Sequence, residues 1–313
     1  MPIAIALHGG AGTILRSEMK PELEIRYTDA LQDAVRTAYQ HLHHQGSALD
    51  AVEIAVRMLE DCPLFNAGKG SVFTAQGKHE MDASIMDGRQ RNAGAVSLVS
   101  GIKNPIQLAR LVMEKSEHVF MAGSGAIAFA RQMQCEFADE AYFYDQFRFD
   151  QWQKIKDTDA FQLDHSVDTA QKPPKKMGTV GAVACDSYGN IAAATSTGGM
   201  TNKRWGRIGD SPVIGSGTYA NNQTCAVSCT GSGEYFLRGV VAYDVSCLIE
   251  YKNYTLEQAC REVVLKRLPR LGGDGGLVAV NAEGNISMPF NTEGMYRASK
   301  TAERELIAIY DEA

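Results

Sequence analysis

Gly178 and Thr179 form a junction at which a polar, proline-bearing segment gives way to an apolar run, in KKMGTVGAVAC. A threonine hydroxyl is a weak nucleophile near neutral pH and needs an adjacent base. If the peptide bond before Thr179 were cut, the new α-amino group, with a reference pKa near ~8, would supply that base from the same residue. The uncut chain could cut itself, because hydroxyl attack on the unhindered Gly178 carbonyl gives an ester that water releases.

Most Gly-Thr pairs before strands are structural, so this junction gains meaning only from the motifs around it. Those motifs are HGGAG (8–12), FNAGKGSVFT (65–74), GTVGAVA (178–184), ATSTGGMTNK (194–203), GRIGDSP (206–212), YANN (219–222), CTGSGE (229–234) and FNTEGMYR (290–297). Together they resemble the plant-type L-asparaginase/isoaspartyl peptidase family, whose members are N-terminal nucleophile hydrolases. The resemblance covers nearly the whole chain in the family's order.

The resemblance implies a catalytic set around the junction. Thr179 would be the nucleophile after self-cleavage between Gly178 and Thr179, and Thr197, the second threonine of TSTGG, would hydrogen-bond it. Thr230 and the backbone N–H of Gly231 would form the oxyanion hole. The segment around them follows a strand and precedes a helix, where free backbone N–H groups can face an anion.

The same resemblance implies a substrate pocket. Arg207 and Asp210 of GRIGD would bind the substrate's α-carboxylate and α-amino group, and Gly231 and Gly233 would line that pocket. The chemistry agrees, because a guanidinium fork matches a carboxylate and a carboxylate pairs with an ammonium. Taken alone, Arg207 and Asp210 would read as a surface ion pair, and the two threonines as ordinary strand hydroxyls.

A third implied feature is a sodium-binding loop in LEDCPLFNAGK. Main-chain carbonyls would hold the ion, which is reasonable chemistry for a hard cation. By position, the ligands would be Leu59, Glu60, Cys62, Phe65, Ala67 and Lys69. Asn66, in the same loop, is a candidate helper near the scissile bond.

The expected activity is hydrolysis of β-aspartyl dipeptides and L-asparagine, releasing L-aspartate through an acyl-enzyme on Thr179, with no organic cofactor. Other readings stay open: a glycosylasparaginase, a taspase-like hydrolase of the same fold, or an uncleaved, non-catalytic binding protein. A nucleotide site is less supported, because HGGAG and GSGAIAF lack the residues of a P-loop or dinucleotide fingerprint. Arg204 and Trp205 depart from the family pattern beside Arg207, which puts substrate preference in doubt.

Composition excludes several protein classes. The 313 residues include 31 basic and 37 acidic side chains, so the net charge of −6 gives no general attraction to nucleic acid or anionic membranes. No basic leader or long apolar run is present, which predicts a cytoplasmic protein that does not span a membrane. The seven cysteines are scattered, and Cys225 and Cys229 are expected to be packed, reduced thiols on one strand face.

Hydrophobic periodicity predicts the elements that position these residues. A buried strand is expected over 3–7, helices over 23–45 and 123–134, and short strands over 80–87 and 94–99. Ser47 should cap a second helix, Asn104-Pro105 should start a third, and Thr255 with Gln258 should form a capping box. Apolar hairpins are expected at 180–185 with 191–196 and at 277–280 with 285–289, and a helix over 234–251.

These elements favour an α+β fold with two packed sheets between helices, and the resemblance implies the four-layer αββα sandwich of N-terminal nucleophile hydrolases. Residues 1–178 would form an alpha subunit that ends in a flexible linker, at about 157–178. Residues 179–313 would form a beta subunit that begins with Thr179. The resemblance implies a mature homodimer of cleaved alpha/beta heterodimers.

Overall fold

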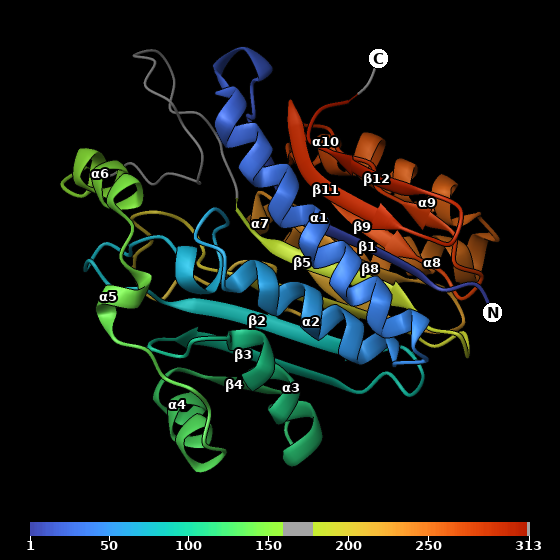
Figure 1. Ribbon diagram of the computed structural model, residues 1–313, viewed down its shortest axis with the longest axis horizontal. Coiled ribbons are helices and arrows are strands. Elements are labelled where there is room, and N and C mark those ends of the chain that lie inside the picture. Colours follow the sequence, from blue (N-terminus) through green and yellow to red (C-terminus); the bar gives the residue numbers. More distant parts are fainter. Residues whose placement is uncertain (159–177, 312–313) are drawn as a thin grey trace.

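An eight-stranded sheet forms the centre of the structure, a computed structural model that describes residues 1–158 and 178–311 (Figure 1). Neighbouring strands are antiparallel except for the last pair, which is parallel. In spatial order the strands are β12 (Glu305–Ala308), β11 (Gly294–Lys300), β1 (Ala4–Gly12), β5 (Val180–Cys185), β6 (Ile191–Thr197), β2 (Met81–Asp87), β3 (Ala93–Val99) and β4 (Phe120–Ala122). The hairpin that follows Thr179 therefore lies between β1 and β2, which come from the first half of the chain.

A second, four-stranded sheet packs on one face of the first. Its strands, in spatial order, are β10 (Ile286–Ser287), β9 (Gly275–Val280), β8 (Ala226–Gly231) and β7 (Thr218–Ala220). Because side chains alternate along a strand, β5 contributes Val183 and Cys185 to the core between the sheets and Ala182 and Ala184 to the core under the helices. Every residue of β5 is buried, as the apolar hairpin pattern predicts.

Helices cover the outer faces of both sheets. On the large sheet these are α1 (Pro21–His43), α2 (Ala48–Glu60) and α3 (Pro105–Lys115). On the small sheet they are α7 (Gly233–Gly239), α8 (Val241–Lys252), α9 (Leu256–Glu262), η3 (Val263–Arg267) and α10 (Leu268–Arg270). The layers follow the order helix, sheet, sheet, helix, so the predicted αββα sandwich is confirmed (Figure 1).

Smaller elements lie around this frame. They are η1 (Arg16–Glu18), η2 (Gly68–Gly70), α4 (Gly123–Gln132), α5 (Glu140–Phe143) and α6 (Gln146–Ile155). In Figure 1, α4, α5 and α6 lie together on the side of the molecule away from α8 and α9. None of the helices in the described part of the chain is both long enough and apolar enough to cross a membrane.

The predicted helix caps are confirmed where the structure tests them. The Ser47 hydroxyl accepts a hydrogen bond from Asp50 N at 3.1 Å at the start of α2. Thr255 and Gln258 form the reciprocal capping box of α9. Asn104 precedes α3 as expected, with Pro105 first in the helix, although its side chain makes no cap hydrogen bond.

Three expected elements differ most from the structure, and one of them, the strand expected over 285–289, is only β10, Ile286–Ser287. The strand expected over 3–7 continues through HGGAG to Gly12, because β11 pairs with that glycine-rich stretch across a bulge between His8 and Gly10. The single helix expected over 234–251 is two helices, α7 and α8, separated by Val240 at φ 48°. A β-branched residue in the left-handed region is rare, so local sequence gives no warning of this break. Of the linker expected at 157–178, residues 159–177 lie outside the described residues.

Candidate active site

Thr179 and Thr197 meet at one end of the β5–β6 hairpin. Thr179 directly precedes β5 and Thr197 is the last residue of β6, and the antiparallel pairing of Val180 with Ser196 places the two threonines side by side. The Thr179 hydroxyl donates a hydrogen bond to Oγ1 of Thr197 at 3.2 Å. Thr179 is only 7% exposed, so its hydroxyl lies in a site largely shielded from bulk water.

The Gly178 carbonyl, on the peptide bond before Thr179, accepts two side-chain hydrogen bonds. Nδ2 of Asn66 donates to it at 3.0 Å, and Oγ1 of Thr197 also donates at 3.0 Å. Asn66 is itself held in place, since its Nδ2 donates to Gly199 O at 2.7 Å. Two donors on one carbonyl polarise its carbon toward a nucleophile, and the hydroxyl of the next residue is adjacent.

His8 contacts the backbone of Thr179. No role was assigned to His8 from the sequence. Its Nδ1 is 3.0 Å from Thr179 O, and its Nε2 is 2.9 Å from Oγ of Ser228. Complete burial lowers the pKa of His8 to about 3, so the ring is neutral. Nδ1 must therefore carry the hydrogen that the Thr179 carbonyl accepts, and Nε2 accepts from Ser228. HGGAG was the only sequence signal for this contact.

Thr230 and Gly231 end strand β8 at the same end of the sandwich. Oγ1 of Thr230 accepts a hydrogen bond from Ala11 N at 3.2 Å, which ties the end of β8 to the HGGAG stretch of β1. His8 pairs with Gly181 across β1 and β5, so this part of β1 runs beside the Thr179 end of β5. The structure thus brings Thr230 into the same neighbourhood as Thr179.

Arg207 and Asp210 lie together but do not pair with each other. Instead, Arg207 forms a two-pronged ion pair with Glu234, with Nε to Oε1 at 2.8 Å and Nη2 to Oε2 at 2.9 Å. Both converge on Gly233, where an added Cβ would lie 2.9 Å from Nη2 of Arg207 and 2.9 Å from Oδ1 of Asp210. The missing side chain of Gly233 leaves room between a cation and a carboxylate.

Asp210 is a buried carboxylate with an oxygen to spare. It is 4% exposed, and within residues 1–158 and 178–311 its Oδ2 has no hydrogen-bond partner. Burial raises the pKa of Asp210 to about 7, and the nearby Arg207 charge only partly opposes that rise. A buried, unpartnered carboxylate oxygen is costly unless a ligand satisfies it, and an ammonium group suits it.

Comparison with known proteins gives the site its family. Residues 1–308 match the asparaginase family. This chain belongs to the asparaginase family. It is 54% identical over 296 residues to the isoaspartyl peptidase of Escherichia coli (strain K12), covering 94% of this chain and 91% of the relative. It is 53% identical to the isoaspartyl peptidase of Salmonella typhimurium, with 94% of each chain covered. The plant-type L-asparaginase of Pyrococcus furiosus is 41% identical, also with 94% of each chain covered.

Two buried charged residues, Asp82 and Lys203, lie near Thr197 in this family member. Asp82 is on β2, which pairs with β6 on the edge opposite β5. Asp82 of β2 is the register partner of Thr197, and it is completely buried. Lys203 is buried too, and its Nζ donates to Glu80 O at 2.8 Å. Burial lowers the pKa of Lys203, although Asp82 and Glu80 oppose that effect. Neither residue was given a role from the sequence, where Lys203 entered only within the ATSTGGMTNK motif.

The predicted cation loop runs from the end of α2 to η2. Three of the six predicted carbonyls, those of Cys62, Phe65 and Ala67, each accept one main-chain hydrogen bond, at 2.9–3.4 Å, and keep a second lone pair. The Leu59 carbonyl accepts from both Asp61 N and Cys62 N. An added Cβ would lie 2.5 Å from Glu60 O at Gly68 and 2.1 Å from Phe65 O at Gly70. These glycines let the loop backbone pass close to its own carbonyl oxygens. No cluster of three or more His, Cys, Asp or Glu side chains suited to a metal occurs among the described residues.

From the sequence, only the main-chain carbonyl of Glu60 was considered, but its side chain also has a structural role. Its Oε1 accepts hydrogen bonds from Ser196 Oγ at 2.6 Å and from Ile106 N at 3.0 Å. Burial raises the pKa of Glu60 to about 8, against the lowering effect of those hydrogen bonds. Through the hydrogen bond to Ser196, Glu60 anchors the residue before Thr197.

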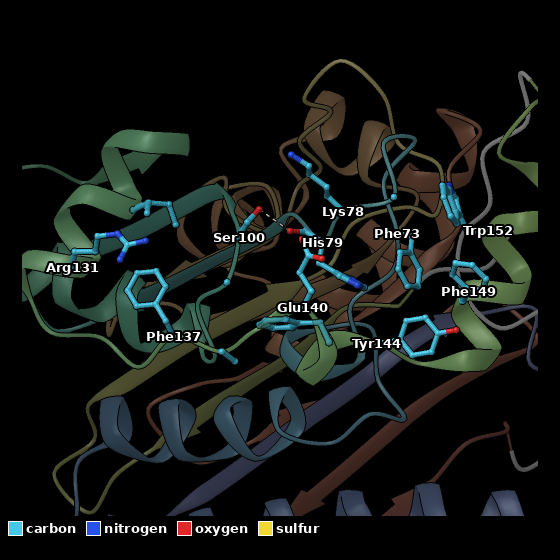
Figure 2. A pocket seen from close by; sticks show the side chains of 15 residues that line it. Phe73, Lys78, His79, Ser100, Arg131, Phe137, Glu140, Tyr144, Phe149 and Trp152 are labelled. Atoms are coloured by element: carbon cyan, nitrogen blue, oxygen red, sulfur yellow. Dashed lines mark hydrogen bonds between the residues drawn. The ribbon is translucent and has the colours of Figure 1, made fainter.

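A separate cavity of about 680 Å³ has aromatic walls and contains none of the predicted site residues (Figure 2). Phe73 stacks on Trp152 there, with ring centroids 5.6 Å apart, and Phe149 lies 5.7 Å from Phe73. The Ser100 hydroxyl donates to the His79 carbonyl at 2.7 Å at its floor. Since none of the described residues that line it is a predicted catalytic or substrate-binding residue, this cavity is not the candidate active site.

Proposed function

We propose that the chain is an autoproteolytically activated amidohydrolase that hydrolyses β-aspartyl dipeptides and L-asparagine and releases L-aspartate. The observation that carries this proposal is the Gly178 carbonyl, which accepts hydrogen bonds from Asn66 and Thr197 beside the Thr179 hydroxyl. Membership of the asparaginase family supports it, as do the relatives named isoaspartyl peptidase.

Maturation would begin when the Thr179 oxygen attacks the Gly178 carbonyl carbon. The Gly178–Thr179 C–N bond breaks, the hydroxyl proton goes to the new amine, and Gly178 is left as an ester on Thr179. Water then hydrolyses the ester and frees the Gly178 carboxylate, the Thr179 hydroxyl and its α-amino group. Asn66 and Thr197 would stabilise the negative charge that develops on the Gly178 oxygen.

The two products of this cut would stay together. Residues 1–178 supply β1 and β2, and residues 179–313 supply β5 and β6, which lie between them. Separating the products would break three antiparallel ladders, β1–β5, β1–β11 and β2–β6, and both hydrophobic cores. The proposed alpha and beta subunits therefore form one folded unit, divided at residue 178.

Substrate hydrolysis would reuse Thr179 with its own α-amino group as base. The oxygen attacks the side-chain carbonyl of the substrate, the amine takes the proton and returns it to the leaving amine, and water hydrolyses the aspartyl ester. Thr230 and Gly231 N–H would bind the developing oxyanion. Arg207 and Asp210 would hold the α-carboxylate and α-ammonium groups, with Gly233 leaving space for the α-carbon.

The test is an intact mass of the purified protein, read beside activity on three substrates: a β-aspartyl dipeptide, L-asparagine and a glycosylated asparagine. We expect fragments of 178 and 135 residues (313 − 178) that begin at Met1 and Thr179. Thr179→Ala should remain one chain and be inactive. Activity in that uncleaved variant would overturn the mechanism. Preference for the glycosylated substrate, or equal turnover of a substrate whose α-carboxylate is amidated, would overturn the substrate class.

We also propose that a sodium ion binds the carbonyl loop of residues 59–69, and that the mature enzyme is a dimer of cleaved heterodimers. The ion would supply one positive charge to main-chain carbonyl oxygens of this loop. Melting temperature in sodium chloride should exceed that in choline chloride at equal ionic strength. Light scattering should give twice the 34.0 kDa mass of one chain.

A further inference from the structure

Glu234 occupies one edge of the Arg207 guanidinium. It is the second residue of α7, directly after Gly233, and its two oxygens accept from Nε and Nη2 at 2.8 and 2.9 Å. A guanidinium has a second edge, formed by Nη1 and the other hydrogen of Nη2. In the described part of the chain, Nη1 makes no hydrogen bond, so that second edge is unused.

Asp210 is a second carboxylate close to Arg207. An added Cβ at Gly233 would lie 2.9 Å from both Nη2 of Arg207 and Oδ1 of Asp210. Arg207 and Asp210 therefore face the same small space from two sides. A buried carboxylate beside a guanidinium normally forms an ion pair with it, because each is costly to bury alone. Here the pair is absent, and Glu234 has taken the guanidinium instead.

We propose that Glu234 is a positioning residue that keeps Arg207 and Asp210 apart, so that each stays free for the opposite charge of an amino-acid substrate. The proposal rests on the proposed function, because it assigns the two freed charges to the α-carboxylate and α-ammonium groups. Glu234 holds the Nε edge and turns the Nη edge toward Gly233 and Asp210. The substrate then binds to a cation and an anion that have not neutralised each other.

The surroundings of Glu234 favour this role over that of a competitor for the substrate's place. Its side chain is 53% exposed and that of Arg207 is 20% exposed, so Glu234 approaches from the solvent side. The hydrogen bonds and charge of Arg207 lower the pKa of Glu234, against the raising effect of partial burial, and keep it ionised at neutral pH. The space at Gly233 lies between Nη2 of Arg207 and Oδ1 of Asp210.

Removing Glu234 tests the proposal directly. In Glu234→Ala and Glu234→Gln, Arg207 can turn to Asp210, and both substrate charges are lost to an internal ion pair. We expect the dissociation constant of L-aspartate and the KM for a β-aspartyl dipeptide to rise about two- to fivefold, within the range of a partly exposed ion pair. The value of kcat should change less than twofold, and fragments should form as in the wild type.

A matched control and a double-variant cycle separate positioning from general damage. Glu114→Gln removes a carboxylate from the Arg110–Glu114 pair on α3, outside the site, and should leave KM unchanged. The double variant, which carries both Arg207→Ala and Glu234→Ala, should bind L-aspartate no more weakly than Arg207→Ala alone. The reason is that Glu234 acts only through Arg207. L-Isoasparagine, the α-amide of aspartate, should lose less affinity than L-aspartate when Glu234 is replaced.

Three results would overturn the proposal: tighter L-aspartate binding in Glu234→Ala, additive losses in the double variant, or an unchanged dissociation constant in both single variants. The first would make Glu234 a competitor of the substrate. Calorimetry with L-aspartate needs no turnover, so these outcomes are distinct from a failure of the proposed activity. That failure would show as a wild-type chain that matures but does not hydrolyse β-aspartyl dipeptides.

Discussion

Asn66 bridges two carbonyls with one amide group: its Nδ2 lies 3.0 Å from Gly178 O and 2.7 Å from Gly199 O. Its Oδ1 accepts from Val72 N at 3.1 Å, which fixes which end of the amide faces Gly178. Asn66 therefore links the loop after α2 to the bond that maturation would cut and to the turn after Thr197.

Asn66→Asp should slow maturation. A carboxylate in that place presents an acceptor to the Gly178 oxygen, so it repels the charge that the cleavage step develops there. Losing one preorganised donor costs roughly 100-fold in rate, and we expect at least a tenfold slower appearance of the 178- and 135-residue fragments, followed by gel. Asn92→Asp makes the same exchange in an exposed turn and should mature normally. Unchanged fragment formation in Asn66→Asp would remove Asn66 from the processing machinery.

Gly233→Ala should impair substrate binding without impairing maturation. The added methyl would lie 2.9 Å from both Arg207 Nη2 and Asp210 Oδ1, inside the space assigned to the substrate's α-carbon. We expect KM for β-aspartyl dipeptides to rise at least tenfold, with normal fragment formation. Gly125→Ala is the matched control, because an added Cβ at Gly125, also on a helix, meets nothing within 4 Å. Wild-type KM in Gly233→Ala would place the substrate elsewhere.

Motif order could predict the fold and the proximity of Thr179 and Thr197, because these two residues lie at one end of a predictable hairpin. Thr179 and Thr197 flank an apolar hairpin, so their proximity follows from the hairpin register alone. The side-chain partners of Arg207 and His8 could not be predicted from the sequence. Arg207 pairs with Glu234 across 27 residues, and His8 reaches Ser228 across 220, and both contacts depend on how the layers stack.

Backbone conformation was likewise beyond local sequence. Val240 breaks the expected helix in the left-handed region, where a β-branched side chain is disfavoured, so its neighbours in the fold must stabilise it. The HGGAG stretch reads as a loop by its glycines, yet it extends β1 because β11 supplies a partner along it. In both places tertiary packing overrode local preference.

Arg207→Ala should separate the two reactions of Thr179. Self-cleavage uses the Gly178 carbonyl and needs no substrate carboxylate, so the variant should still mature. Substrate hydrolysis loses a charge-assisted contact worth roughly 2–4 kcal/mol, which is about 30- to 1000-fold in kcat/KM. Arg207→Lys should recover only part, because a point charge cannot reproduce the fork. Normal maturation with near-wild-type kcat/KM would show that the assigned role of Arg207 is wrong.

Asp210 should set the pH dependence of ligand binding. Burial raises its pKa to about 7, so the carboxylate is ionised above that pH and protonated below it. Only the ionised form pairs with an ammonium group, so the affinity for L-aspartate should fall as pH drops through 7, by up to about tenfold per unit. Calorimetry from pH 5.5 to 8.5 measures this slope. In Asp210→Asn the affinity for L-aspartate should be low and nearly independent of pH. That result would assign the pH dependence to Asp210 and not to the α-amino group of Thr179.

The same carboxylate should lower stability at high pH, and this gives the Asp210 prediction an independent test. Its pKa is raised on folding, so the folded chain binds an extra proton between about pH 4, where an unfolded aspartate titrates, and about pH 7. The destabilisation is absent below that window and complete above it. Asp210→Asn should therefore melt at a higher temperature than the wild type at pH 8 and at nearly the same temperature at pH 4. An Asp210→Asn variant that melts lower at pH 8 would mean that the carboxylate is satisfied within the folded chain, and its free oxygen would then no longer argue for a bound ammonium group.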